Sequence, residues 1–141
     1  MTALPDGTYL ILNGGQLGYA GFGLGKNPNL NAVLYDPTKP VNSRMSIMAN
    51  TTVARMYHSE AILMQDGSVL VSGSDPQDPE FPEEYRVEKF YPPYLLNGIT
   101  PPTFTITNKD WSYGQSISFS LGGAPAGAIR VSLMAVEAST Q

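Results

Sequence analysis

The sequence predicts an all-β protein, and three observations carry that prediction. Short runs in which apolar and polar residues alternate recur along the chain, as at 103–107 and 116–121, and this alternation is the period of a half-buried strand. The 14 glycines and 12 prolines are spread along the chain, which is typical of turns between strands and unlike a disordered low-complexity tract. No segment longer than a turn or two has a helical period.

Two segments in the first part of the chain share one pattern. Asp6-Gly7 precedes an apolar run at 8–15, and Asp66-Gly67 precedes a similar run at 68–76. Asp-Gly between such runs predicts a hairpin turn of type I′, because glycine adopts the positive φ that this turn requires. The two pairs lie 60 residues apart, near the repeat of about 50 residues in kelch-type propellers, whose blades have four strands. We therefore expect a partial kelch-type β-propeller, with about two blades, over residues 1–96.

The character of the sequence changes after Tyr91. Four prolines and an Asn-Gly pair between 92 and 102 are typical of a linker between domains. Clean alternation follows at 103–107, 116–121 and 129–134, and short strands spaced by about 12 residues are typical of an immunoglobulin-like sandwich. Because such a domain usually has about 100 residues, we expect 97–141 to be an incomplete immunoglobulin-like β-sandwich.

Composition excludes several classes of protein. A net charge of −4 without a Lys/Arg cluster argues against a nucleic-acid partner. The apolar runs are far shorter than the roughly 18 residues that would predict a membrane-spanning helix. The first residues lack the basic start and apolar run of a signal peptide. The chain has no cysteine, so disulfides, zinc ribbons and thiol chemistry are excluded.

The pair Tyr57-His58, which contains the single histidine of the chain, is the first candidate site. Phenolate oxygen and imidazole nitrogen suit Cu(II), iron or zinc. Adjacent residues of an extended strand point to opposite faces, so the pair would converge only if the strand entry is bent. The alternative is an ordinary pair at a strand start, with the tyrosine packed and the histidine hydrogen-bonded.

Three other motifs have weaker functional interpretations. The glycine-rich stretch 18–25 lacks the spacing and the strand-helix setting of a phosphate-binding loop, so we expect a loop over a sheet face, whose Tyr19 and Phe22 would line a substrate mouth. The acidic stretch 75–84 lacks the spacing of a calcium loop and favours a solvated surface loop. Asn50-Thr51-Thr52 is an N-glycosylation sequon, which has meaning in a secreted chain.

Longer stretches carry a family resemblance. They are RMYHSEAILMQDGSVLVSGSDP at 55–76, EYRVEKFYPPYL at 84–95, PPTFTI at 101–106 and LPDGTYLILNGGQLGYAGFG at 4–23. Over essentially the whole chain they resemble copper radical oxidases of the glyoxal oxidase and galactose oxidase type, from the last propeller blades into the C-terminal sandwich domain. The resemblance implies an extracellular enzyme that oxidises small aldehydes or primary alcohols by two electrons and reduces O2 to H2O2.

The same resemblance implies a mononuclear copper bound by two tyrosines and two histidines. One tyrosine of the family is cross-linked to a cysteine and carries a radical; the other directly precedes a histidine ligand, and this pair maps onto Tyr57 and His58. Tyr57 would be the axial ligand and the base that accepts the substrate's proton, since a nearby cation lowers a phenol's pKa. His58 would be an equatorial ligand.

The chain also departs from the family pattern. It has no cysteine for the cross-link, and Gln141 follows Ser139-Thr140 where the family has its second histidine. We therefore expect a fragment of a copper radical oxidase that is inactive as an isolated chain. Two alternatives stay open: a non-catalytic β-propeller module that binds carbohydrate or protein through the Tyr19 and Phe22 loop, and a folded remnant that self-associates through open strand edges.

Overall fold

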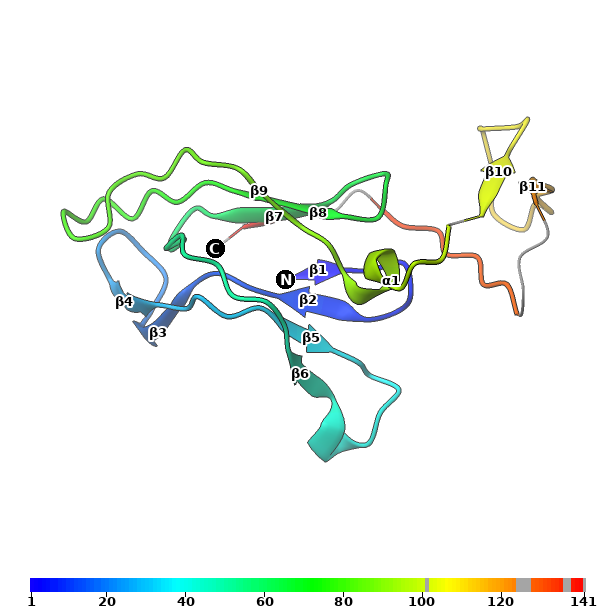
Figure 1. The fold of residues 1–141 in the computed structure, drawn as a ribbon. Helices are drawn as coiled ribbons and strands as arrows, with labels where there is room; N and C mark the ends of the chain where they lie inside the picture. The colour runs from blue at the N-terminus through cyan, green and yellow to red at the C-terminus, as the bar shows by residue number, and fades with distance from the viewer. Residues whose placement is uncertain (101, 124–127, 136–137, 141) are drawn as a thin grey trace.

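The computed structural model describes residues 1–100, 102–123, 128–135 and 138–140, and these form antiparallel sheets with almost no helix (Figure 1). The first four-stranded sheet has the order β1-β2-β5-β6. Its strands are β1 (Thr2–Ala3), β2 (Tyr9–Ile11), β5 (Val33–Tyr35) and β6 (Met45–Ile47). The all-β class predicted from the sequence is confirmed.

A hairpin of its own interrupts this sheet between β2 and β5. It consists of β3 (Gly15–Gly18) and β4 (Gly25–Pro28), with Leu17 paired to Lys26 and Gly18 paired to Gly25. The glycine-rich stretch of the sequence thus forms the tip of a two-stranded hairpin. A short 3-10 helix, η1 (Val41–Ser43), lies between β5 and β6.

The second four-stranded sheet has the order β12-β7-β8-β9. Its strands are β7 (Glu60–Leu63), β8 (Val69–Ser72), β9 (Glu88–Phe90) and β12 (Ala138–Thr140). β12 comes from the C-terminal end of the chain, and its Thr140 pairs with Glu60 at the start of β7. The strand β12 lies in the range 97–141, which the sequence pattern assigned to a second domain, and it is nevertheless the edge strand of a sheet formed with β7, β8 and β9.

The remaining elements follow the second sheet. Helix α1 (Pro93–Leu96) begins directly after β9, and Tyr94 from it donates a hydrogen bond to the carbonyl of Gly67. Within the described residues, β10 (Thr103–Thr105) and β11 (Ser120–Gly122) form a two-stranded sheet of their own, which lies apart from the two larger sheets in Figure 1. No helix in the described ranges has the length and apolarity needed to cross a bilayer. The kelch-type propeller over 1–96 and the immunoglobulin-like sandwich over 97–141 stay predictions.

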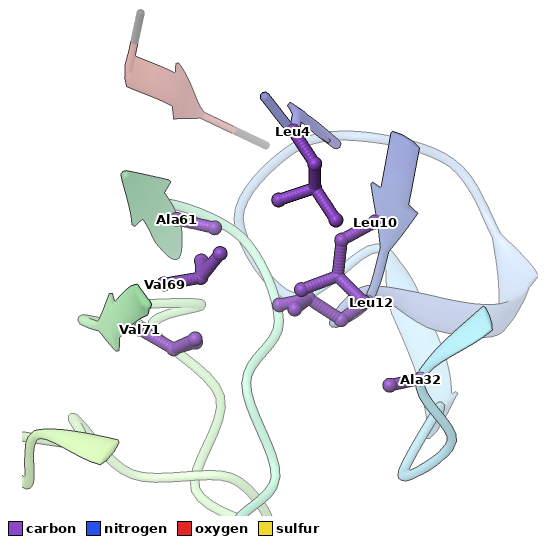
Figure 2. Packing of buried hydrophobic residues seen from close by; sticks show 7 residues of the cluster. All are labelled: Leu4, Leu10, Leu12, Ala32, Ala61, Val69 and Val71. Carbon is purple, nitrogen blue, oxygen red and sulfur yellow. The ribbon is translucent and has the colours of Figure 1, made fainter. Parts of the chain in front are cut away.

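The core lies between the two four-stranded sheets. Small and branched side chains from both sheets meet there (Figure 2): Leu4, Leu10, Leu12, Ala32, Ala61, Val69 and Val71. Leu10 and Val69 have no exposed surface at all. In β8 the side chains are alternately buried and half-buried, which is the period-2 alternation expected of a strand on this layer.

The two Asp-Gly hairpins form as predicted, but the turn type differs. In the first, Gly7 N donates to Leu4 O and Leu4 N donates to Thr8 O, and Gly7 alone among the three loop residues has a positive φ, of 88°. The Met64–Ser68 loop has the same two bonds. This is the three-residue loop in which a left-handed glycine follows an ordinary turn, so the type I′ prediction was wrong for both hairpins.

An aspartate closes each of three turns in the same way. Its Oδ1 accepts from the backbone N–H and the hydroxyl two residues on, in the pairs Asp6–Thr8, Asp36–Thr38 and Asp66–Ser68. Asp66 also accepts from Lys89 Nζ of β9 at 2.7 Å. The bond from Lys89, followed by those from Ser68, holds the pKa of the Asp66 carboxyl well below its usual range.

Replacing Asp66 with asparagine should weaken the acid sensitivity of the fold. Because the folded-state pKa of Asp66 is lowered, its stabilising effect is present above the ordinary carboxyl pKa of about 4 and is lost as the pH falls further. Thermal unfolding measured from about pH 5 down to about pH 2 should therefore show a flatter Tm profile for Asp66→Asn. Asp6→Asn, which alters the matching turn at Thr8, is the control; equal flattening in both variants would contradict a role for the Lys89 bond.

Candidate functional site

Tyr57 and His58 occupy the two central positions of a tight turn just before β7. Ser59 N donates to Met56 O at 3.2 Å, and His58 has a left-handed φ of 63°. The aromatic rings of the pair are stacked, with centroids 4.1 Å apart and planes inclined by 25°. On an extended chain the two side chains would point to opposite faces. They were expected from the sequence to converge only if the strand entry is bent, and the turn supplies this bend.

The left-handed conformation of His58 is held by the end of β8 and the loop after it. Asp75 N donates to Tyr57 O at 2.8 Å. Gly73 approaches the turn so closely that a Cβ atom there would lie 2.8 Å from His58 O. A positive φ is uncommon for a residue other than glycine, although histidine is among the types that adopt it more often. Such backbone outliers cluster at functional sites, where the surrounding structure enforces them.

A buried arginine positions this turn. The Arg55 side chain has no exposed surface, and its Nε and Nη2 contact Glu88 Oε2 of β9, both at 3.1 Å. The guanidinium also donates to two carbonyls at 2.9 Å, from Nη1 to Gly73 O and from Nη2 to Arg86 O. The other carboxylate oxygen of Glu88 accepts from Thr51 Oγ1 at 2.6 Å. The guanidinium therefore links the approach to the turn with β8 and β9.

Backbone contacts join the same segment to the first sheet. Gly14 N, just after β2, donates to Arg55 O at 2.8 Å. The next residue, Met56, is buried, and its N–H donates to Ser74 Oγ at 2.8 Å. The Met56 methyl group packs so closely on the β3–β4 hairpin that a Cβ on Gly25 would lie 3.0 Å from it. Residues 55 and 56 thus connect both sheets and the hairpin.

The tip of the hairpin covers the ring pair. Phe22 meets Tyr57 and His58 edge to face, each with centroids 5.1 Å apart and planes near perpendicular, an arrangement that aromatic pairs prefer. Two contacts hold the tip: Gly23 N donates to Pro76 O at 2.6 Å, and Lys26 Nζ pairs with Asp78 Oδ2 at 2.9 Å. The glycine-rich stretch is therefore a cover over Tyr57 and His58.

A hollow of about 310 Å³ lies beneath this hairpin. Tyr57 and Met56 line one side, and Tyr19 with the hairpin glycines lines another. Tyr19 is 73% exposed, whereas Phe22 is turned toward the ring pair. Of the two aromatic residues that the sequence placed at a substrate mouth, Phe22 contacts the candidate site directly and Tyr19 borders the adjoining hollow.

The acidic loop after β8 is partly neutralised by basic partners. Lys26 holds the pKa of the Asp78 carboxyl below its usual range. Arg86 lowers the pKa of Glu84 to about 2 through hydrogen bonds from its side chain and backbone. Within the described ranges, no three histidine or acidic side chains gather in a group that would hold a metal ion.

The ring pair nevertheless brings two side chains of metal-binding type together. A half-buried phenol and an exposed imidazole stand next to each other, and nitrogen and oxygen donors of these kinds suit Cu(II). β12 brings the C-terminal part of the chain alongside, since Thr140 is opposite Glu60, two residues from His58. Gln141, where the resemblance implies a histidine, lies outside the described residues.

Sequence reasoning missed the arginine that positions the site. Arg55 stands directly before the Met-Tyr-His stretch, but arginine is mostly exposed in proteins, and nothing in the local pattern marks it as buried. The available signal was the low share of charged residues, 14%. When charged residues are few, each one near a strand is a candidate for a specific ion pair.

Comparisons with known proteins identify the relatives of this chain. Residues 1–94 match the family model described as glyoxal oxidase N-terminus. A WSC domain-containing protein of Arthroderma benhamiae is 66% identical over 99% of this chain and 15% of its own length. The aldehyde oxidase GLOX1 of Arabidopsis thaliana is 44% identical over 79% of this chain, and the aldehyde oxidase GLOX of Vitis pseudoreticulata is 45% identical over 68%. The chain spans 15% to 20% of the length of these relatives.

Removing the buried guanidinium should destabilise the fold strongly. In Arg55→Met, the Glu88 carboxylate and the carbonyls of Gly73 and Arg86 lose their donors, which should cost about 3 kcal/mol or more. The matched control is Arg86→Met, whose side chain is 67% exposed and whose loss should change the stability little, because exposed ion pairs contribute little. Urea unfolding measures both. Equal losses of stability would contradict the role assigned to Arg55.

A methyl group at Gly73 should disturb the turn. Gly73→Ala combines a φ of 74° with a contact of 2.8 Å to His58 O, whereas Gly7→Ala has a similar φ of 88° and open space around it. The control should lose about 1–2 kcal/mol from backbone strain alone. Gly73→Ala should lose more, and the NMR signals of the His58 ring should shift. If both variants lose the same stability and the His58 signals stay in place, Gly73 does not hold the turn.

Proposed function

The chain belongs to the glyoxal oxidase family, and on this premise we propose that Tyr57 and His58 are two of the copper ligands of an extracellular oxidase. The whole protein would oxidise small aldehydes or primary alcohols and reduce O2 to H2O2. The observation that supports this most directly is the stacked ring pair, whose centroids lie 4.1 Å apart, on a strained turn that Phe22 contacts. Two of the relatives are named aldehyde oxidases, which agrees with the substrate class.

Each side chain at the site has a distinct role in this proposal. Tyr57 Oη binds the metal and accepts the substrate's hydroxyl proton, and the His58 imidazole is the second ligand. Phe22 packs edge to face on both rings and helps to hold them in place. The Arg55 network fixes the turn, so that both donors are held in place before metal or substrate arrives. Copper, when bound, supplies the redox chemistry that carries two electrons from the substrate to O2.

The described part of the chain contains half of the ligand set that the family resemblance implies. There is no cysteine for the cross-linked tyrosine, and position 141 is glutamine. We propose that the 141-residue chain alone binds copper through Tyr57 and His58 and has no oxidase activity. In the same proposal, residues 1–96 are part of a kelch-type propeller and 97–141 begin an immunoglobulin-like sandwich.

Copper titration tests the ligand pair. His58→Asn removes the imidazole and keeps a residue type that tolerates a left-handed φ; Tyr57→Phe removes the phenol and keeps the ring. Each substitution should weaken Cu(II) binding by at least about tenfold, because the loss of a residue that only hydrogen-bonds to a metal ligand already costs that much affinity. Calorimetry measures the affinity. Tyr19→Phe, which alters a side chain of the hollow and neither ligand, should leave the affinity unchanged.

Unchanged copper affinity in His58→Asn would contradict the proposed site. The copper-loaded chain should also release no peroxide from glyoxal, and clear turnover would contradict the proposed inactivity. Binding of a glycan without copper, lost in Tyr19→Ala, would favour the alternative of a non-catalytic carbohydrate-binding module, for which the exposed Tyr19 ring beside the hollow is the supporting observation.

A further inference from the structure

The loop between β6 and β7 carries the sequon Asn50-Thr51-Thr52, which is the single Asn-X-Ser/Thr sequence of the chain. Asn50 and Thr52, the two residues that such a signal requires, are both exposed. No bond from any residue of the described ranges engages the Asn50 amide. The folded chain therefore leaves this amide free for attachment of a sugar.

The middle residue of the sequon fixes the loop from the opposite side. Thr51 N donates to Leu30 O at 2.9 Å, and Thr51 Oγ1 donates to Glu88 Oε1 at 2.6 Å and accepts from Val53 N at 3.0 Å. Thr51 thus faces the protein while its two neighbours are exposed. A substituent on Asn50 would break none of these bonds.

Asn50 also lies at the edge of a second hollow, of about 350 Å³, between the two four-stranded sheets. Its walls are mainly apolar and include Leu12, Val71 and Phe90. Leu96 of α1, at its rim, is 70% exposed. Apolar surface of this kind is unfavourable in water unless it is covered, and a sugar attached to Asn50 would start at its border.

We propose that Asn50 is an N-glycosylation site and that the first sugars of its glycan cover the hollow between the two sheets. In the attachment step, Asn50 Nδ2 bonds to the anomeric carbon of a lipid-linked oligosaccharyl diphosphate. The bond from that carbon to the phosphate oxygen breaks, the lipid diphosphate leaves, and Nδ2 gives up one proton. That the chain is secreted, as N-glycosylation requires, rests on the proposed function. That Asn50 is exposed and accessible does not depend on it.

Expression with a cleavable secretion leader in a eukaryotic host tests the site whatever the natural location of the chain. The intact mass of the secreted 141-residue chain should fall on treatment with an amidase that removes N-linked glycans. Thr52→Ser keeps the sequon and should be glycosylated, whereas Thr52→Ala and Asn50→Gln should have the unmodified mass. A secreted wild-type chain with the unmodified mass would overturn the proposal.

Binding of an apolar fluorescent dye tests the covering role. The glycosylated chain should bind less dye than the enzymatically deglycosylated chain, because the glycan occupies the hollow. The Leu96→Ser substitution in the deglycosylated chain should also lower dye binding, because it removes apolar surface at the rim of the hollow. Equal dye binding with and without the glycan would overturn the covering role. The copper affinity of the chain does not depend on Asn50, so this proposal and the copper proposal can fail separately.

Discussion

The burial of the Arg55 guanidinium is the constraint on which the candidate site depends. A charge with no exposed surface is tolerable only when every donor has a partner, and here the partners come from separate segments: Glu88 of β9, the carbonyl of Gly73 after β8 and the carbonyl of Arg86. These contacts, together with the bond from Gly14 N to Arg55 O, restrain the position of residue 55. The turn that contains Tyr57 and His58 begins at Met56, the next residue, so the arginine restrains its location.

The turn gains its second support from close backbone packing. Gly73 and the β3–β4 hairpin both pack closely against the segment, and Phe22 contacts the two rings. By contrast, no side chain of residues 102–123 and 128–135 is buried, and Tyr113 and Leu133 are largely exposed. The stability of the described chain therefore comes from the two four-stranded sheets, which are also the elements that position the site.

Features that depend on neighbouring residues could be predicted from the sequence, whereas features that depend on contacts between distant residues could not. The hairpins at Asp6-Gly7 and Asp66-Gly67 were predictable because their signals are local, although the same dipeptide serves two loop types and the wrong one was chosen. The candidate pair Tyr57-His58 was found from residue type and family resemblance. Its geometry was not, because the left-handed φ of His58 is imposed by Gly73, a tertiary contact. The pairing of β12 with β7 and the burial of Arg55 are long-range in the same sense.

The central claim is that the ring pair is a preorganised set of two metal ligands. Because His58 is the single histidine of the chain, electron paramagnetic resonance of the Cu(II)-loaded chain gives a direct measurement. With ¹⁵N-labelled histidine, the account predicts hyperfine coupling from one imidazole nitrogen, which changes with the isotope and disappears in His58→Asn. A Cu(II) signal that is insensitive to the histidine label would contradict it.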